Sequence, residues 1–280
     1  MARRDTSNRS RFWFDPAIAG LSLLHADFTR HDYAPHAHDG LVIAVTEIGG
    51  SEFKSRGSVE EASARMLLVF NPDEPHSGRM GRSRHWRYRS FYLHEAAIDA
   101  VNAALGNDQW PSFTANSFYD PDLIGAFHTL HLTLDQRYTD RCDGLRTEEL
   151  LAVSFGRLFR RYSSANQRIE LAPLDHTLLN KVVATMRERH TEKLGLATLS
   201  ATVGLTPFQL IAMFNRLIGL SPHAYLTQIR LRTAIHHMQM RHSIAEAAVA
   251  SGFYDQSALT KHFKRCFGIT PLQYRMASTT

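Results

Sequence analysis

The sequence predicts an α+β protein with a strand-rich N-terminal half and an all-helical C-terminal third. Short apolar runs separated by Gly, Pro and Asn turns predict strands between about residues 21 and 93. Apolar residues at helical spacing follow, and one sequence pattern occurs twice near the C-terminus. The 280 residues suffice for two cores, so we expect a first domain at 1–165, a linker at 166–174 and a second domain at 175–280.

The clearest predicted strands are apolar and rich in β-branched or aromatic residues. They are Leu41–Val45, Met66–Phe70 and the weakly alternating Tyr88–Leu93. The expected turns between strands are Gly49-Gly50, Arg56-Gly57 and Asn71-Pro72-Asp73. Many short strands joined by turns predict a small sandwich or barrel, with a mouth wide enough for one small molecule.

Two helices with one apolar face each are expected after the strands. The first face consists of Leu123, Ile124, Phe127, Leu130, His131 and Leu134, and the second of Leu145, Leu151, Phe155, Leu158, Phe159 and Tyr162. Packing on the preceding strands and contact with a second copy of the chain both account for these faces.

One pattern occurs twice in the C-terminal third. Phe214-Asn215-Arg216-x-x-Gly219-Leu220-Ser221-Pro222-x-x-Tyr225 returns 49 residues later as Phe263-Lys264-Arg265-x-x-Gly268-Ile269-Thr270-Pro271-x-x-Tyr274. Each copy follows a short helical run that ends in a glycine, Gly204 or Gly252. Two helix-turn-helix units are therefore expected, a motif whose second helix fits the DNA major groove.

Local signals define the second helix of each unit. Thr206 is expected as the N-cap of the first, with Pro207 at the first helical position, and Asp255 as the N-cap of the second. The residues expected to pack inward are Leu210, Met213, Phe214, Leu217, Leu259, Phe263 and Phe267. Those expected to face outward or lie at the edge are Phe208, Gln209, Ala212, Asn215 and Arg216, then Gln256, Ser257, Thr260, Lys261 and Lys264.

The residues between the two units, Pro222 to about Arg241, are expected to form one long helix. Some 20 helical residues span about 30 Å, comparable with the repeat of about 34 Å in B-DNA. Charge agrees with a DNA partner for this part. From Asp175 onward the chain has 12 Lys+Arg and 5 Asp+Glu, whereas the residues before it carry 20 basic and 22 acidic groups.

The second copy resembles a known family signature. Ala247-x-x-x-x-Gly252-Phe253-x-Asp255-Gln256-Ser257-x-Leu259-x-x-x-Phe263-Lys264-x-x-x-Gly268-x-Thr270-Pro271-x-x-Tyr274-Arg275 is similar to the C-terminal signature of AraC/XylS transcription regulators. The resemblance covers about 100 residues. It implies promoter binding through two helix-turn-helix units, a preceding sensory domain, a homodimer formed by helices beside that domain, and contact with RNA polymerase.

The same resemblance places base-reading residues at seven positions. They are Phe208, Ile211 and Ala212 in the first unit and Gln256, Ser257, Thr260 and Lys261 in the second. Ile211 and Ala212 depart from the polar or Arg side chains usual in the family. Because they cannot hydrogen-bond a base edge, polar readout is expected mainly from the second unit.

Two histidine motifs in the strand-rich half resemble the cupin motifs of the family's sensor domain. They are Pro35-His36-Ala37-His38 and Asn71-Pro72-Asp73-Glu74-Pro75-His76. The expected effector-binding residues are His36, His38, Glu47, His76, Trp86, Tyr88 and Tyr92. Arg87 and Arg89 should face away from Tyr88, and would favour an anionic effector if their side of the strand were the inner one.

His36, His38 and His76 are also weak candidates for a metal site. Metal-binding cupins add a Glu soon after the second His, where this chain has Val42 and Ile43. An effector pocket is therefore the favoured interpretation of the histidines, and no metal or cofactor is expected.

Other classes of protein lack support in the sequence. No run of 18 apolar residues and no apolar leader is present, so a cytoplasmic protein is expected, without membrane contact. Cys142 and Cys266 are expected as reduced thiols, with Cys266 packed between Phe263 and Phe267. Walker, Rossmann and G-x-S-x-G motifs are absent, which disfavours an enzyme.

The sequence thus predicts a transcription regulator, by analogy an activator, controlled by a small-molecule effector. The runner-up is a metal-dependent cupin enzyme fused to a DNA-binding anchor. A third interpretation is a DNA-binding protein whose N-terminal half only oligomerises.

Overall fold

The computed structural model describes residues 8–64, 66–107, 109–136, 144–164 and 174–277. They form two compact units, the first within Met1–Asp143 and Leu150–Ile169 and the second within Gly144–Glu149 and Glu170–Thr280. All the described strands lie in the first unit, and the second unit is helical throughout its described part, in agreement with the predicted α+β class. Of the predicted linker 166–174, all but Leu174 lies outside the described residues.

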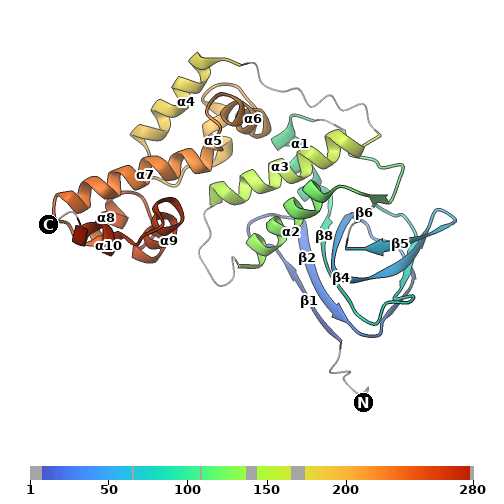
Figure 1. Cartoon of the computed structure of the whole chain (residues 1–280). Helices are drawn as coiled ribbons and strands as arrows, with labels where there is room; N and C mark the ends of the chain where they lie inside the picture. The colour runs from blue at the N-terminus through green and yellow to red at the C-terminus, as the bar shows by residue number, and fades with distance from the viewer. Residues whose placement is uncertain (1–7, 65, 108, 137–143, 165–173, 278–280) are drawn as a thin grey trace. The chain divides into compact units, whose positions relative to one another are not determined.

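The first unit is an antiparallel barrel of two sheets that share one long strand (Figure 1). The described strands are β1 (Arg9–Phe14), β2 (Leu21–Phe28), β3 (Asp32–His36), β4 (Leu41–Ser55), β5 (Ser58–Ser63), β6 (Leu67–Phe70), β7 (His76–Arg79), β8 (Trp86–Leu93) and β9 (Ser117–Phe118). The larger sheet has the order β1-β2-β8-β4-β6-β9. The second half of β4 pairs instead with β5 and β7, and β7 pairs with β3.

Two glycines let β4 pass from one sheet into the other. Gly49 has φ +69°, and a Cβ there would lie 1.6 Å from the His85 carbonyl oxygen. A Cβ at Gly50 would lie 2.6 Å from the Ala62 carbonyl oxygen. The prediction of a turn at Gly49-Gly50 is therefore wrong, because the glycines serve a bend within a continuous strand where neighbouring backbones approach closely.

The other two predicted turns are confirmed. Arg56 (φ 49°) and Gly57 (φ 81°) form the two-residue connection between β4 and β5, where two positive φ values match the twist of the strands. Asp73, also at positive φ, lies in the turn after β6.

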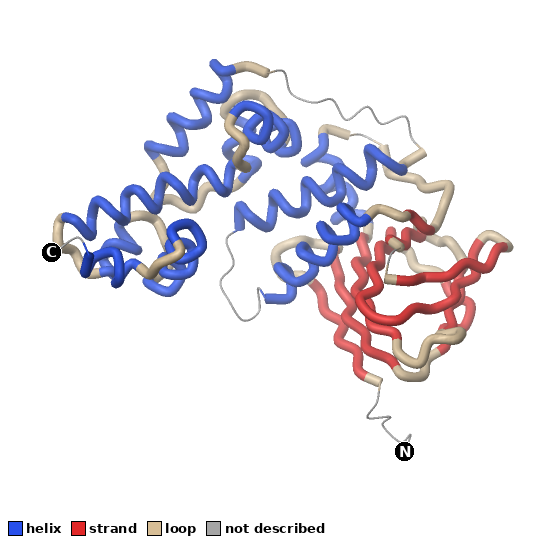
Figure 2. Tube along the Cα trace, in the orientation of Figure 1, coloured by secondary structure: helices blue, strands red, loops and turns tan. Residues whose placement is uncertain are grey.

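Three helices accompany the barrel, α1 (Glu95–Leu105), α2 (Pro121–Gln136) and α3 (Gly144–Tyr162), with α2 and α3 beside the strands (Figure 2). The Phe91 ring on β8 contacts Phe127 of α2 and Phe155 of α3, with centroids 5.5 and 6.3 Å apart. The α2 face made of Leu123, Phe127, Leu130, His131 and Leu134 is fully buried within the chain. Of the two interpretations of this face, packing on its own barrel accounts for it.

The second unit contains the two helix-turn-helix motifs. Its helices are α4 (His176–Glu188), α5 (Leu196–Ala201), α6 (Pro207–Leu217), α7 (Pro222–Gln239), α8 (Ile244–Ala250), α9 (Gln256–Phe267) and α10 (Pro271–Ala277). The predicted caps are confirmed, since Thr206 accepts from the Gln209 N–H and Asp255 accepts from the Ala258 N–H. The long helix between the motifs is α7, whose 18 residues span about 27 Å.

The core of the second motif ends before the end of α9. Leu259 and Phe263 are fully buried among residues of α7 and α8. Phe267 lies one turn further, 45% exposed, with its ring beside Phe263, so its predicted inward packing is wrong. Cys266 is exposed rather than packed between these rings, and Cys142 lies outside the described residues. Of the helices in the described part of the chain, none has both the length and the apolar character to cross a bilayer.

Candidate functional site

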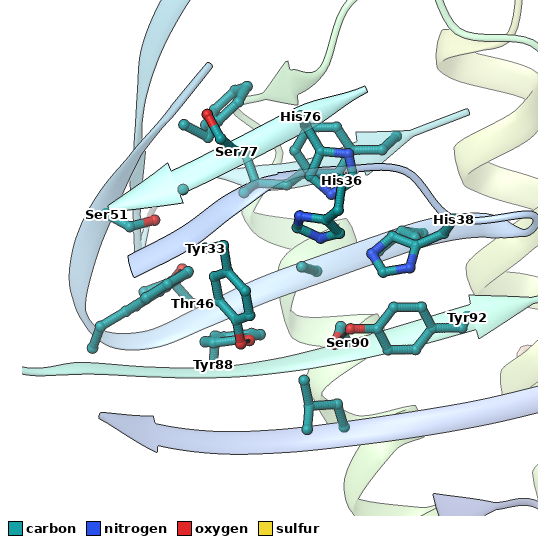
Figure 3. Close-up of a pocket in the computed structure, with 18 residues that line it drawn as sticks. Tyr33, His36, His38, Thr46, Ser51, His76, Ser77, Tyr88, Ser90 and Tyr92 are labelled. Carbon is teal, nitrogen blue, oxygen red and sulfur yellow. Dashed lines mark hydrogen bonds between the residues drawn. The ribbon is translucent and has the colours of Figure 1, made fainter. Parts of the chain in front are cut away.

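A cavity of about 130 Å³ lies inside the barrel, between its two sheets (Figure 3). Its wall is made of aromatic and aliphatic side chains, with hydroxyl groups and imidazoles among them. The hydroxyl groups belong to Tyr33, Thr46, Ser51, Ser77, Tyr88, Ser90 and Tyr92. Among the described residues that line the cavity, none carries a carboxylate, an amine or a guanidinium group.

Six of the seven predicted effector residues line this cavity. They are His36, His38, His76, Trp86, Tyr88 and Tyr92. Sequence reasoning missed Thr46 on β4 and Ser90 on β8, although both share the strand parity of lining neighbours such as Tyr88. Strand alternation, applied systematically, would have found them.

Glu47, the seventh predicted residue, does not line the cavity. It follows Thr46 on β4 and points to the opposite face, where Arg89 and the His128 Nε2 atom bind its Oε1 atom, the latter at 2.8 Å. Burial raises the pKa of Glu47, but the hydrogen bonds from Arg89 and His128 outweigh burial and lower it. Strand alternation would have predicted this position as well, since consecutive strand residues face opposite sides and Thr46 faces the cavity.

Arg87 and Arg89 likewise face away from the cavity. Arg87 pairs with Asp27 on β2 at 2.7 Å, and Arg89 pairs with Glu47. Because neither arginine lines the cavity, these two side chains do not favour an anionic effector.

Three imidazoles meet at one end of the cavity (Figure 3). The ring centroids lie 4.5 Å apart for His36 and His76, 4.8 Å for His36 and His38, and 5.3 Å for His38 and His76. Burial and the two neighbouring imidazoles lower the pKa of His38 to about 4, and burial also lowers the pKa of His76.

The turn that carries His76 is fixed by the buried carboxylate of Glu74. This carboxylate accepts hydrogen bonds from Arg56, Ser55 and Asn116 and from both the backbone and side-chain N–H groups of Asn71. Burial raises the pKa of Glu74, but the bonds from Arg56 and Ser55 outweigh it and lower the pKa to about 2. Glu74, which sequence reasoning left without a role, thus holds the strand that presents His76.

A pair of tyrosines forms another polar point of the wall. The hydroxyl groups of Tyr33 and Tyr88 lie 2.5 Å apart, and the Tyr88 ring stacks on Trp86 with centroids 4.4 Å apart. Burial raises the pKa of Tyr33 to about 12, so this hydroxyl remains a hydrogen-bond donor near neutral pH.

The second unit presents α9 as a polar helix surface. Gln256, Ser257, Lys261 and Lys264 are exposed, and Thr260 is half-buried with its hydroxyl donating to the Gln256 carbonyl. These residues begin at the N-terminal turn of α9 and follow one side of it, opposite the buried Leu259 and Phe263. The predicted outward face of this helix is confirmed.

Helix α6, the second helix of the first helix-turn-helix motif, differs from the prediction. Phe208 and Ile211 are buried, with 8% and 3% exposure, so the expected outward or edge position is wrong for Phe208 and neither side chain is free to reach a base. Gln209 and Ala212 are half-buried, and the Gln209 side chain accepts from the Thr206 N–H in a capping box.

Asn215 and Arg216 near the end of α6 are exposed, as predicted. The exposed polar positions of the first motif are thus fewer than those of the second. This agrees with the expectation that polar readout lies mainly in α9.

Comparisons with known proteins agree with both units. The model of the AraC-like ligand binding domain matches residues 18–172, and a helix-turn-helix domain model matches residues 199–277. The HTH-type transcriptional regulator YbfI of Bacillus subtilis is 28% identical over 223 residues, covering 79% of each chain. The arabinose operon regulatory protein of Escherichia coli is 25% identical over 267 residues, covering 92% of this chain and 88% of its own.

A shorter match falls on a virulence regulon transcriptional activator, VirF of Yersinia enterocolitica. It is 36% identical over 76 residues, which is 26% of this chain and 27% of VirF. Since the ligand-binding model alone covers more than half of the chain, and the helix-turn-helix model covers the repeated motif, the chain belongs to the AraC family of transcription regulators, with an AraC-like ligand-binding domain and a helix-turn-helix DNA-binding domain.

Proposed function

We propose that this regulator reads promoter DNA mainly through α9, under the control of a small molecule bound in the barrel. The exposed polar row of Gln256, Ser257, Lys261 and Lys264 on α9 carries the proposal. A Gln amide can bond adenine in a bidentate manner, and a Lys ammonium can bond guanine or a phosphate. Asn215 and Arg216 of α6 supply contacts in a neighbouring groove, with Arg216 suited to phosphate.

Burial limits what α6 can read. Because Phe208 and Ile211 are buried, the first motif contributes through Gln209, Ala212, Asn215 and Arg216. The Gln209 oxygen is already bonded to the Thr206 N–H. The first motif therefore mainly positions the protein on the duplex, while the second distinguishes base pairs.

The effector proposed for the barrel is a molecule of about the size of a benzene ring. The cavity measures about 130 Å³, close to the cavity of about 150 Å³ that holds benzene in an engineered protein. Its wall offers aromatic faces and hydroxyl groups, and no charged side chain of the wall would pair with an ionic group. Shape and hydrogen bonds to residues such as Tyr33, Thr46 and Ser90 would select the effector.

Binding of the effector would act by favouring one of two arrangements of the regulator, which requires different affinities for the two. We propose activation rather than repression, in line with the name of the matched VirF protein. We also propose that the regulator forms a homodimer and contacts RNA polymerase in the cytoplasm. The α2 face buried on the barrel is already occupied, so a dimer would use other residues. Binding rather than catalysis is proposed for the barrel.

Selection of DNA from a random pool by the full chain, followed by sequencing, tests the proposal. We expect a defined consensus. The logarithm of the affinity for it should fall linearly with the logarithm of salt concentration, with a slope of about −0.9 per neutralised phosphate. A pool that stays random after selection, or an affinity indifferent to salt, would contradict sequence-specific binding through the basic second unit.

A further inference from the structure

We propose that His36, His38 and His76 bind one divalent transition-metal ion that prefers imidazole, such as Zn²⁺, Co²⁺ or Ni²⁺. The rings come from β3, the turn after it and β7, and one nitrogen from each lies within 4.8 Å of the others. This site goes beyond the proposed function, since reading DNA through α9 requires no metal.

The hydrogen bonds of two rings determine which nitrogen is available. The Nδ1 atom of His36 lies 2.7 Å from the Ala34 carbonyl oxygen, and that of His76 lies 2.9 Å from the Glu74 carbonyl oxygen. A carbonyl only accepts, so Nδ1 must carry the hydrogen in both rings. The Nε2 lone pairs are therefore available, and a bond from the other ring nitrogen to a carbonyl is the usual support of a metal-binding histidine.

Of the three rings, that of His38 is the one whose position can adjust. In a tetrahedral site with metal–nitrogen bonds of about 2.05 Å, ligand nitrogens lie about 3.3 Å apart, so the widest nitrogen pair must close by up to about 1.5 Å. The His38 ring contacts His36, His76 and Tyr92 only through ring faces and edges, and no hydrogen bond ties it to another described residue. Rotation of this side chain brings its nitrogen toward the other two.

The remainder of the cluster is rigid. Glu74 holds the turn before β7 through bonds to Arg56 and Asn116, and the His76 ring stacks on Phe70 with centroids 4.1 Å apart. Two ligands are thus held in place before a metal arrives, which reduces the entropy lost on binding.

The missing acid does not prevent this site. Three histidines with an open fourth position are a known zinc geometry. Here the cluster lines the cavity, so the fourth position would be filled by water or by an oxygen or nitrogen atom of a small molecule in the cavity. Imidazoles without a carboxylate favour the later first-row divalent ions over Mg²⁺ or Ca²⁺.

Titration of the full chain with Co²⁺ after chelator treatment tests the site. We expect one ion per chain, visible d–d absorption of a low-coordinate nitrogen site, and displacement by Zn²⁺. His38→Ala should weaken Co²⁺ binding at least about 100-fold, more than the loss seen for supporting residues. His128→Gln, a histidine of the same unit outside the cluster, should bind like the unchanged chain.

A second variant separates loss of a ligand from failure to fold, because it adds an absorption band rather than removing one. His38→Cys should add a sulfur-to-cobalt charge-transfer band, which appears only if position 38 is a ligand. Failure of the unchanged chain to bind Co²⁺ or Zn²⁺ at micromolar concentration would overturn the site. So would binding that His38→Ala leaves unaltered, or a cysteine variant that binds cobalt without the new band. None of these outcomes bears on DNA binding.

Discussion

Side chains of the same type have different roles on α6 and α9, and local burial accounts for the difference. Gln209 and Gln256 occupy early positions of the second helix in each motif. The Gln209 amide closes a capping box with Thr206, whereas the cap of α9 is made by Asp255 and Gln256 remains exposed. A polar side chain can read a base only when the fold leaves it outside.

Replacement of Lys261 by Ala should weaken binding to the selected DNA by about 1–3 kcal/mol and relax preference at a particular base pair. The same is expected for Gln256→Ala, because both side chains lie on the exposed row of α9. Competition binding with single-base variants of the site measures both effects. Lys181→Ala, an exposed lysine on α4, serves as the control. Equal losses on all sequences would mean that Lys261 contacts phosphate alone.

In the first unit, the Asp120 carboxylate stabilises the fold through its hydrogen bonds. It accepts from the Leu123 N–H at the start of α2 and from Arg161 and Tyr162 of α3, at 2.6 and 3.0 Å for the last two. Burial raises the pKa of Asp120, but these hydrogen bonds outweigh burial and lower it. Since the folded pKa is depressed, the stabilisation is present above the unfolded value of about 3.9 and is lost as pH falls through the folded pKa.

Asp120→Ala should therefore lower the free energy of unfolding by about 1.5–3 kcal/mol at pH 7, the range for hydrogen bonds to a charged group. The difference from the unchanged chain should shrink below about pH 4. Urea unfolding at several pH values measures it, with the exposed neighbour Asp122→Ala as control. A difference that persists undiminished at low pH would show that the charge is not responsible.

At the scale of the element, strand β4 determines the shape of the barrel. Its first half pairs with β6 and β8, and its second half pairs with β5 and β7. The strand changes partners around Gly49-Gly50, just after its register against β8 shifts between Thr46 and Ile48. The two glycines predicted a break in the strand, whereas in the structure Gly49 adopts a positive φ and Gly50 allows a close backbone approach within one bent strand.

Gly49→Ala should destabilise the first unit by more than about 3 kcal/mol, because positive φ and a backbone clash act together. The matched control is Gly57→Ala, at φ +81° with no atom within 4 Å of the added Cβ. That variant should lose only about 1–2 kcal/mol. Thermal unfolding of both variants gives the comparison, and equal losses would contradict the role of close backbone approach at Gly49.

At the scale of the whole molecule, the two units have different charges and different kinds of site. The described strands enclose a cavity whose lining contains no Asp, Glu, Lys or Arg, whereas the part of the chain from Asp175 has 12 basic and 5 acidic residues. This division predicts that DNA binding and ligand response can be separated.

A fragment of residues 175–280 should bind the selected DNA with a salt dependence similar to that of the full chain, since the basic residues are retained. It should show no change in DNA affinity with a small molecule that stabilises the full chain against heat. Fluorescence anisotropy at several salt concentrations measures both properties. A folded fragment without DNA affinity would show that the first unit contributes to the DNA contact.

Local rules predicted much of this protein from the sequence. Helix caps at Thr206 and Asp255, the long α7 and the repeated motif follow from residues near one another in the chain, where hydrogen bonds and helical spacing act locally. Strand parity likewise contained the information that separates Thr46 from Glu47.

Only the tertiary structure decided which surfaces remain free. The family resemblance places Phe208 and Ile211 among the base-reading residues, but the structure buries both. Glu47 is predicted to line the pocket, but the structure places it beside Arg89 and His128. Likewise, the sequence names His36, His38 and His76 as candidates for one site, but only the closed barrel brings the His76 ring, from a distant segment, beside the other two. Sequence fixes local geometry through short-range forces, but burial and convergence depend on contacts between residues far apart in the chain.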